Sequence, residues 1–295
     1  MKERLLIIGG SGLLGSSIVR VAAQNFEVYA TYYLHPVQIS GCTLVPLDIR
    51  DRDETLSLLG KIKPNIVIHT AALVDVDYCE EHPGEAWLIN AEGTENVALA
   101  SKKAGTKLIY ISTDSVFDGE KGMYTEADAP SPINIYAKTK REGETRIQHL
   151  LPDSLIIRTA FYSRSLPSRH SLAEWIITEL KRGGTPRMFT DVFFSPIPAD
   201  TLAEAMLEMY SKGLTEIYHV GGTERCSKYA FGLEIARIFG FDDSHIQPST
   251  LVEAKLKAPR PKDLSLNINK VVNSANIHLP NLREGISQLR EKPSL

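Results

Sequence analysis

Short apolar runs alternate with longer amphipathic stretches along the first half of the chain. The short runs are nearly continuous in Ile, Val and Leu, which is typical of strands that helices cover on both faces. The longer stretches place apolar residues three or four positions apart, as a helix with one buried side requires. The expected strands are Arg4–Ile8, Glu27–Thr31, Ile66–His69, Lys107–Ile111 and Ser154–Arg158, and the expected helices are Leu13–Gln24, Arg52–Lys61 and Pro83–Ala104. This alternation predicts an α/β fold with a doubly wound parallel sheet.

The pattern changes after Arg158. Prolines become frequent, and two further helices are expected at Leu172–Arg182 and Thr201–Ser211. We therefore expect a first domain over residues 1–160 and a smaller α/β domain over residues 161–295, parts of which return to pack on the first. The smaller domain would close over the ends of the first domain's strands.

The composition narrows the classes of protein to consider. The 295 residues include 33 basic and 36 acidic side chains, a formal net charge of −3, and 43% are hydrophobic. That hydrophobic content is enough for a folded core and excludes bulk disorder. The absence of a long basic run argues against nucleic acid or an anionic membrane as the main partner, and no apolar run is long enough to span a membrane. A small molecule is the expected partner.

The cysteines bear on metal binding and on the cellular compartment. Cys42, Cys79 and Cys226 are scattered, without the spacing of a disulfide framework or a zinc site, so no metal is predicted. This usage fits a reducing cytoplasm. The apolar start of the chain resembles a secretion signal, but its glycines have a better explanation.

A glycine pattern follows the first expected strand directly. Gly9, Gly12 and Gly15 are three positions apart and open the first expected helix. Gly9 would allow a tight turn, Gly12 the close approach of a pyrophosphate, and Gly15 close packing of the helix on the strand. The pyrophosphate would rest on the helix N-terminus, where free N–H groups favour negative charge. In this context the pattern predicts a dinucleotide-binding Rossmann domain, and a glycine-rich turn without a ligand is the alternative.

The end of the second expected strand bears on which dinucleotide binds. An acid that holds the ribose 2′-hydroxyl of NAD is expected there, but Tyr29 to Tyr33 contains none, and Glu27 lies at the wrong end. No arginine stands nearby in the sequence to hold a 2′-phosphate, so His35 is the only cationic candidate. These observations favour NADPH and leave NADH open. Asp48, after a further strand, would either reach the adenine or be an acid at the start of the next helix.

Three side chains could carry acid–base chemistry. Tyr136 and Lys140 are four positions apart on an expected helix after Pro132, so they share one face. A lysine beside a phenol lowers the pKa of the phenol, which lets the tyrosine exchange a proton with a carbonyl or alcohol oxygen. Thr113 follows a strand end, where such sheets bind ligands, and would polarise the same oxygen. Alone, Thr113 is typical of a helix cap and the other two of an exposed helical pair; their occurrence together with the glycine loop favours a reductase site.

Several longer motifs extend these observations. They are Ile111 to Gly119, Tyr124-Thr125-Glu126, the spacing of Pro132, Tyr136, Lys140, Gly143 and Glu144, and also Ala71-Ala72, Val76 to Glu80, Asn90, Arg158-Thr159 and Arg260 to Leu266. Together they resemble the dTDP-4-dehydrorhamnose reductase family of the extended short-chain dehydrogenase/reductase superfamily, over essentially the whole chain. The resemblance implies a Rossmann domain with a small C-terminal substrate domain. It also implies reduction by NAD(P)H of the C4 ketone of a nucleotide-linked 6-deoxy-4-ketohexose, in dTDP-rhamnose biosynthesis the step from dTDP-4-dehydro-L-rhamnose to dTDP-L-rhamnose.

The resemblance also implies a role for individual residues. The catalytic residues would be Thr113, Tyr136 and Lys140. The cofactor would lie against Gly9, Ser11, Gly12, Leu13, Leu14, Gly15, Asp48, Ile49, Ala71, Ala72, Leu73, Tyr136 and Lys140. The sugar would lie against Thr113, Asp114, Ser115 and Phe161. Ser115 and Phe161 stand where the family usually has tyrosine and tryptophan, which puts the exact sugar in question.

Other functions remain open within the same resemblance. One is a non-catalytic NADP-binding regulatory subunit, because that of methionine adenosyltransferase is similar to this family. Another is a nucleotide-sugar epimerase or dehydratase. Dehydratases carry a further acid where this chain has Ser115, and epimerases tend to have a larger C-terminal domain. The resemblance leaves a homodimer open.

Overall fold

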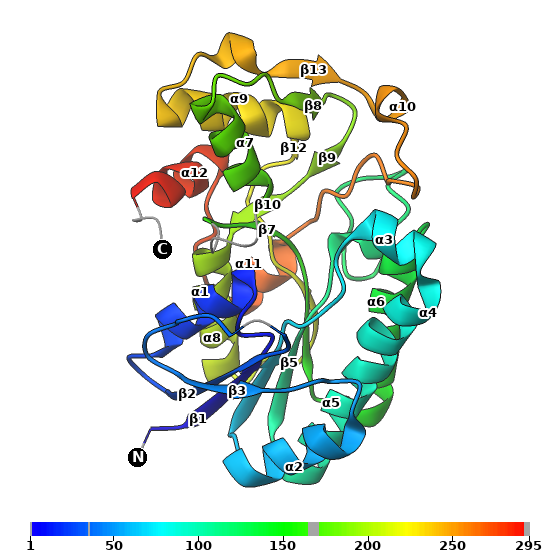
Figure 1. The fold of residues 1–295 in the computed structure, drawn as a ribbon, viewed down its shortest axis with the longest axis vertical. Coiled ribbons are helices and arrows are strands. Elements are labelled where there is room, and N and C mark those ends of the chain that lie inside the picture. Colours follow the sequence, from blue (N-terminus) through cyan, green and yellow to red (C-terminus); the bar gives the residue numbers. More distant parts are fainter. Residues whose placement is uncertain (1, 35, 165–170, 292–295) are drawn as a thin grey trace.

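A seven-stranded parallel sheet forms the centre of the computed structural model, which describes residues 2–34, 36–164 and 171–291 (Figure 1). The strand order is β3–β2–β1–β4–β5–β6–β11, so the chain winds outward from β1 in both directions. Helices therefore cover both faces, and the predicted doubly wound α/β fold is confirmed. The strands are β1 (Arg4–Ile8), β2 (Glu27–Tyr32), β3 (Thr43–Pro46), β4 (Ile66–His69), β5 (Lys107–Ile111), β6 (Leu155–Arg158) and β11 (Glu216–His219).

Alternate residues of each strand enter two different hydrophobic cores. The helices involved are α1 (Leu13–Ala22), α2 (Arg52–Ile62), α5 (Thr94–Ala104), α6 (Ile135–Leu150), α8 (Ala199–Ser211) and α11 (Asn269–Ala275). Leu5 and Ile7 of β1 pack with α1, α8 and α11, whereas Leu6 and Ile8 pack with α2, α5 and α6. Burial on both faces explains why the strands are continuously apolar in sequence.

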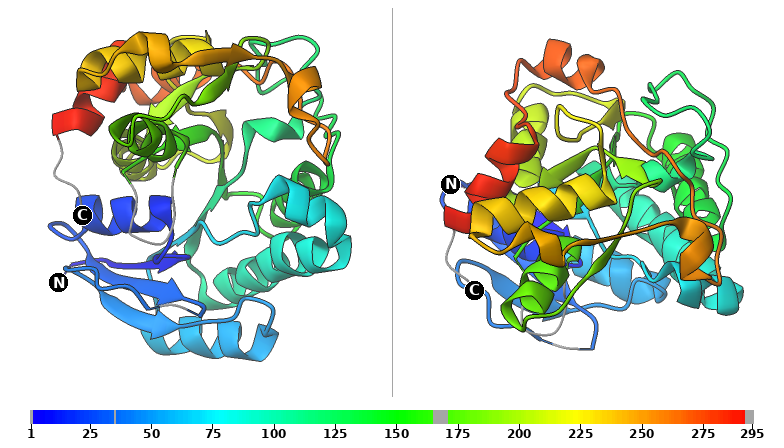
Figure 2. Two further views of the ribbon diagram at one scale, coloured as in Figure 1. Left: turned by 45° about the horizontal axis from the view of Figure 1, so that its top comes forward. Right: turned by 90° about the horizontal axis from the view of Figure 1, so that it is seen from above.

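The second part of the chain extends this sheet and also builds a layer of its own. Strand β11 pairs with β6 in parallel, and α8 packs on α1. The other elements gather beyond the end of the sheet toward which its strands run, around a core from α7, α9 and α12 (Figures 1 and 2). They are β7 (Ala160–Tyr162), α7 (Leu172–Lys181), β8 (Arg187–Phe189), β9 (Phe193–Phe194), β10 (Pro196–Pro198), β12 (Cys226–Ser227), α9 (Lys228–Phe239), β13 (Gln247–Ser249), α10 (Leu251–Ala254) and α12 (Leu282–Glu291). The domain boundary near residue 160 stays a prediction.

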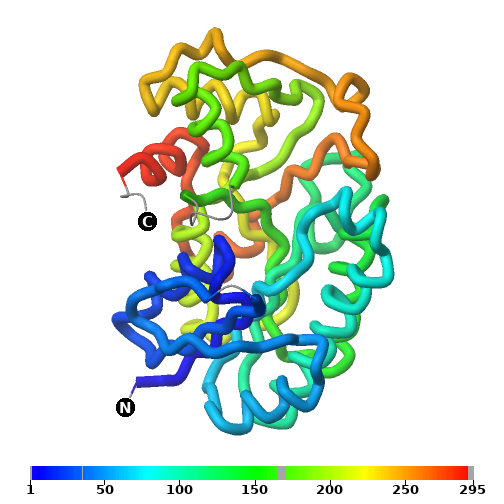
Figure 3. The backbone as a smooth tube through the Cα atoms, in the orientation of Figure 1, coloured from blue at the N-terminus to red at the C-terminus, as the bar shows by residue number. Residues whose placement is uncertain are grey.

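The segment 262–267 ties the two parts together. The Phe193 amide of β9 donates to the Lys262 carbonyl at 2.7 Å, and the Leu264 amide donates to the Phe193 carbonyl at 2.9 Å. Farther along, Leu266 forms a bridge with Tyr124 of the first part. The segment therefore connects β9 to the loop that follows β5, and its path is visible in Figure 3.

The helix predicted at Pro83–Ala104 is divided in the structure. After α3 (Val76–Glu81) come α4 (Pro83–Trp87), a π-helical turn (Leu88–Gly93) and then α5. A π turn accommodates an extra residue, and here it contains Asn90, whose side chain bonds to the backbone of Leu73. The amphipathic pattern predicted the helix but not this turn, because the turn is associated with the contact between Asn90 and the loop that contains Leu73.

Candidate active site

The glycine loop forms the turn between β1 and α1. Gly9 has a φ of +90°, a conformation that glycine adopts without strain. A side chain at Gly15 would overlap the backbone of Gly9 and Gly10, so the close packing predicted there is present. Gly12 is the N-cap of α1 with no capping side chain, and a Cβ on Gly12 would meet only the Gly9 carbonyl within 4 Å. The uncapped N–H groups and the open space above Gly12 fit a dinucleotide pyrophosphate.

The other predicted residues of this loop contribute mainly through their backbone. The Ser11 amide donates to the Thr31 carbonyl at 3.2 Å, which ties the loop to β2. Leu14 is buried in the core beside Ile18, whereas Leu13 is partly exposed at the first position of α1. The loop is thus held by the sheet and by the core beneath it.

An arginine that the sequence did not predict there lies beside the end of β2. The Arg50 guanidinium donates from Nε and Nη2 to the Asp48 carboxylate at 2.9 and 2.7 Å, and Nη2 also contacts the Tyr33 hydroxyl. Its carbon lies 5.0 Å from the centre of the Tyr33 ring. The expectation that no arginine stands near this strand end is wrong, because β3 runs parallel to β2 and brings the residues after both strands together. His35, the cation expected from sequence, lies outside the described residues.

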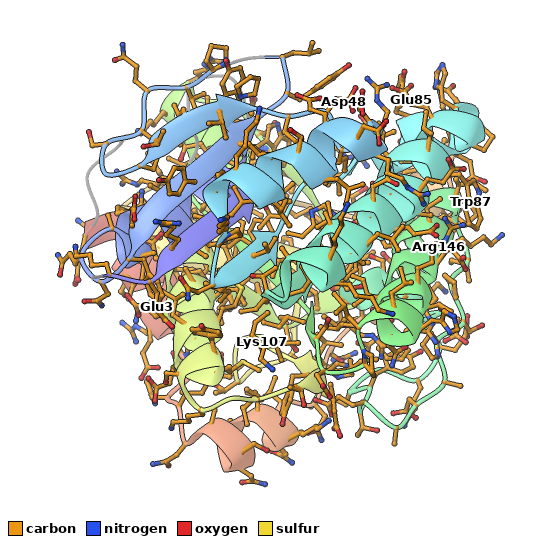
Figure 4. All side chains as sticks on the ribbon, turned by 90° about the horizontal axis from the view of Figure 1, so that it is seen from below. Glu3, Asp48, Glu85, Trp87, Lys107 and Arg146 are labelled. Atoms are coloured by element: carbon orange, nitrogen blue, oxygen red, sulfur yellow. The ribbon has the colours of Figure 1, made fainter. Side chains whose placement is uncertain are left out.

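Of the two roles considered for Asp48, the structure contradicts the one at the start of the next helix, and the contact with the adenine stays a prediction. The N-cap of α2 is Asp51, which accepts a hydrogen bond from the Glu54 amide at 2.9 Å. Asp48 instead holds Arg50, whose hydrogen bonds keep the pKa of that carboxyl below its usual value. Figure 4 shows Asp48 beside the first turn of α2. Ile49, predicted to face the cofactor, is buried with its side chain against Gly93.

The loop after β4 is fixed to both of its neighbours. The Ala71 amide donates to the Ile8 carbonyl at 3.1 Å. Asn90 accepts from the Leu73 amide at 2.8 Å and donates to the Leu73 carbonyl at 3.0 Å and to Thr139 Oγ1 of α6 at 3.1 Å. The predicted cofactor segment Ala71-Ala72-Leu73 thus lies between the glycine loop and the helix that carries Tyr136.

Thr113 and Tyr136 meet at the end of β5. Thr113 caps a short 3₁₀ turn, with its Oγ1 accepting from the Ser115 amide at 3.1 Å, so it has the cap role considered for it as well as a place in the site. Its hydroxyl is also close enough to the Tyr136 phenol to act on the pKa of that group as a hydrogen-bond partner. Burial is the larger influence and raises the pKa of Tyr136 well above its ordinary value of 10.0. The phenol therefore carries its proton at neutral pH.

Lys140 is buried behind this pair. Its Nζ donates to the Ile111 carbonyl at 2.8 Å and lies 4.1 Å from the centre of the Tyr110 ring. Burial lowers the pKa of Lys140 to about 7, against the opposing effect of Glu144. The structure corrects the expectation that the lysine depresses the pKa of Tyr136, because its ammonium is tied to the strand and burial dominates at the phenol.

A buried ion pair joins the ends of β5 and β6 to α6. Arg158 of β6 donates from Nε and Nη2 to the Glu144 carboxylate of α6 at 2.9 and 2.8 Å, and Ser112 donates to Glu144 at 2.5 Å. All three side chains are buried. Glu144 and Arg158 belong to the motifs of the family resemblance, but nothing in the local sequence pattern predicts that they form an ion pair. Their pairing fixes β5, β6 and α6 relative to one another directly beneath Thr113 and Lys140.

Asp114 lies near a cation from the second part of the chain. It is 6% exposed and accepts from Thr113 Oγ1 and Ser115 Oγ at 3.1 and 3.2 Å. Burial raises the pKa of Asp114 to about 6, and Lys228, the first residue of α9, acts in the opposite direction. The sequence reasoning missed Lys228, whose neighbours give no signal. Phe161 in β7 packs on the core beside Ile197. Thr159, two residues before Phe161, accepts a hydrogen bond from the Asp114 amide through its carbonyl at 3.4 Å.

Two further searches concern the described ranges alone. Within residues 2–34, 36–164 and 171–291, no helix is both long enough and apolar enough to cross a membrane. The same ranges hold no group of three or more His, Cys, Asp or Glu side chains placed to bind a metal ion.

Comparison with known proteins gives matches over nearly the whole chain. The sequence profile described as RmlD substrate binding domain matches residues 2–293. The probable low-salt glycan biosynthesis reductase Agl14 of Haloferax volcanii is 30% identical over 287 residues, 96% of each chain. The β subunit of methionine adenosyltransferase 2 of Danio rerio is 29% identical over 281 residues, which cover 91% of this chain and 84% of that protein. The structure of dTDP-4-dehydrorhamnose reductase from Bacillus anthracis in complex with NADP has a TM-score of 0.87 and 28% identity, covering 99% of this chain and 100% of that one.

Proposed function

Since the chain belongs to the RmlD substrate binding domain family, we propose that it is an NADPH-dependent reductase of a nucleotide-linked 6-deoxy-4-ketohexose. The proposed reaction is the reduction of dTDP-4-dehydro-L-rhamnose to dTDP-L-rhamnose. The observation that carries the proposal is the Tyr136 phenol within hydrogen-bonding reach of the Thr113 hydroxyl, at the same end of the parallel strands as the glycine loop. The similarity to the Bacillus anthracis reductase supports the choice of substrate.

The residues that would hold the cofactor come from both sides of β1. The uncapped first turn of α1 would bind the pyrophosphate, and the loop Ala71-Ala72-Leu73 would lie along the dinucleotide. Arg50 and Tyr33, at the end of β2, are suited to a 2′-phosphate, which supports NADPH while NADH stays the alternative. Bound NADPH would supply the hydride that reduces C4. Lys140 would help to hold the nicotinamide ribose.

The proton would come from Tyr136. As the C4 carbonyl becomes an alkoxide, Thr113 would donate a hydrogen bond to the oxygen and Tyr136 would transfer its phenolic proton to it. A raised phenol pKa suits this direction, because the group must arrive protonated in order to donate. The buried Glu144–Arg158 pair keeps the strand end and α6 in register, so the two hydroxyls stay together.

The experiment follows reduced nicotinamide absorbance with dTDP-4-keto-L-rhamnose, using NADPH and NADH in parallel. We expect oxidation with the sugar, faster with NADPH, and a product with the mass of dTDP-rhamnose. A second function is supported by the similarity to the methionine adenosyltransferase β subunit, namely a regulatory subunit that binds NADP without turnover. Tight NADPH binding without oxidation by any nucleotide 4-ketosugar would favour that function and refute the reductase. A homodimer and a cytoplasmic location stay predictions.

A further inference from the structure

Lys228 differs from the other cations that lie where the two parts of the chain meet. Arg225 pairs with Asp263 at 2.7 Å, and Arg260 pairs with Asp77 at 3.1 Å. Among the described residues, the Lys228 ammonium has no ion pair and donates to no carbonyl or carboxylate oxygen. Its one close side-chain contact is the Phe194 ring, whose centre lies 3.4 Å from Nζ.

The position of Lys228 is fixed by backbone contacts. Its amide donates to the Val192 carbonyl at 2.9 Å, and Ser227 caps α9 directly before it. Strand β12 pairs with β9, which carries Phe194, and Phe193 in turn is bonded to Lys262 and Leu264. The ammonium is therefore presented from a rigid part of the upper layer. A partly buried cation held in this way and left without a hydrogen-bond acceptor is costly, which indicates a partner in the working enzyme.

Asp114 is the complementary group on the first part of the chain. Its two side-chain hydrogen bonds both reach Oδ1 and both come from its sequence neighbours, Thr113 and Ser115. The Asp114 amide donates to the Thr159 carbonyl at 3.4 Å, and the next residue of β7 pairs with Pro196 of β10. Pro196 follows closely after Phe194, on whose ring the Lys228 ammonium lies, so Asp114 and Lys228 are near each other without an ion pair between them in the described structure. Asp114 and Lys228 thus offer a strong acceptor and a strong donor in the neighbourhood of Thr113, to which Asp114 Oδ1 is bonded.

We propose that Lys228 and Asp114 together bind one hydroxyl of the substrate sugar, on the carbon next to the reacting carbonyl. This inference rests on the proposed function. A hydroxyl can donate to Asp114 and accept from Lys228 at the same time, so one neutral group satisfies both charges. The substrate diphosphate is a worse match, because the Asp114 carboxylate would repel it. Asp114 follows Thr113 directly, so a group bound here lies beside the oxygen that Thr113 polarises.

The test compares Lys228→Met with the wild-type enzyme and with Lys270→Met. Lys270 is the control, because its ammonium also lies on an aromatic ring, 4.3 Å from the centre of Tyr218, but is already bound to the Glu216 carboxylate and the Ile217 carbonyl. For each protein, the KM and kcat for the ketosugar, the Kd for NADPH and the Ki for dTDP are measured. We expect Lys228→Met to raise KM by roughly 10- to 100-fold, the effect of losing one hydrogen bond to a charged group. NADPH and dTDP binding should not change, and Lys270→Met should behave as wild type.

The outcomes separate this inference from the function on which it rests. An unchanged KM in Lys228→Met, with normal wild-type turnover, overturns the inference and leaves the reductase standing. A rise in the Ki for dTDP that parallels the rise in KM also overturns it, because the lysine would then bind the diphosphate. Absence of ketosugar turnover in the wild type overturns both. A double-mutant cycle tests whether the two residues share one hydroxyl. Asp114→Asn should raise KM by a smaller factor in the Lys228→Met protein than in the wild type, and equal factors in both backgrounds contradict a shared hydroxyl.

Discussion

Replacing Lys140 by Met should change how the free energy of unfolding depends on pH, because the substitution removes a buried ammonium. Lys140 is 3% exposed, and burial lowers its pKa from an ordinary 10.5 to about 7. Methionine keeps most of the stem and removes the charge. The folded protein binds the lysine proton less tightly than the unfolded chain does, so the ammonium lowers stability below pH 7, and the loss disappears as the pH rises toward 10.5.

The size of the effect follows from the shift. Each pKa unit corresponds to about 1.4 kcal/mol, so the shift of Lys140 amounts to about 5 kcal/mol at low pH. The hydrogen bond to Ile111 and the contact with the Tyr110 ring favour the charged form, and they act on stability through the same folded-state pKa, so they are not a separate contribution. Between about pH 6 and about pH 9 the wild type should gain about 3 kcal/mol relative to Lys140→Met.

The assay is urea unfolding of both proteins without cofactor at those two pH values, followed by circular dichroism. The control is Lys103→Met on α5, where the ammonium is exposed to water and no such gain is expected. The reasoning is refuted if the difference in stability between wild type and Lys140→Met is the same at both pH values. That result would mean that folding does not lower the pKa of Lys140.

Substitutions at Tyr136, Tyr110 and Gly15 test other parts of the site. Tyr136→Phe should leave the Kd for NADPH nearly unchanged and reduce kcat by ~10²–10⁴-fold, as expected for loss of a general acid, and unchanged turnover would remove Tyr136 from the mechanism. Tyr110→Leu should lower kcat by removing the ring under Lys140, while Tyr110→Phe keeps the ring and should retain activity; equal losses in both would point to the hydroxyl instead. Gly15→Ala should unfold the protein at lower urea and abolish NADPH binding, because the added methyl overlaps fixed backbone, whereas Gly60→Ala in α2 meets nothing within 4 Å and should stabilise by about 0.5–1 kcal/mol.

Local patterns were enough for the fold and for the core of the site. Continuous apolar strands require two covered faces, and the structure places Leu5 and Leu6 in opposite cores as that rule demands. Gly9 and Gly15 are needed by the geometry of one short turn, so their spacing is visible in sequence. Tyr136 and Lys140 share a helix face because they are four residues apart.

Other properties depended on segments that are far apart in the chain. Arg50 reaches Tyr33 because β2 and β3 run side by side, and Lys228 lies near Asp114 because α9 begins beyond the end of the sheet. The pKa of the Tyr136 phenol was expected to fall and is raised instead. The neighbouring lysine is visible in the sequence, whereas the burial that raises this pKa depends on the tertiary structure.

The sequence by itself thus determined the periodicities, the tight turn and the spacing of the reacting groups, all of which act over a few residues. The tertiary structure decided which charges are desolvated and which distant side chains oppose one another. Desolvation and Coulomb interactions depend on everything within several ångströms in space, and a linear pattern contains no such distances.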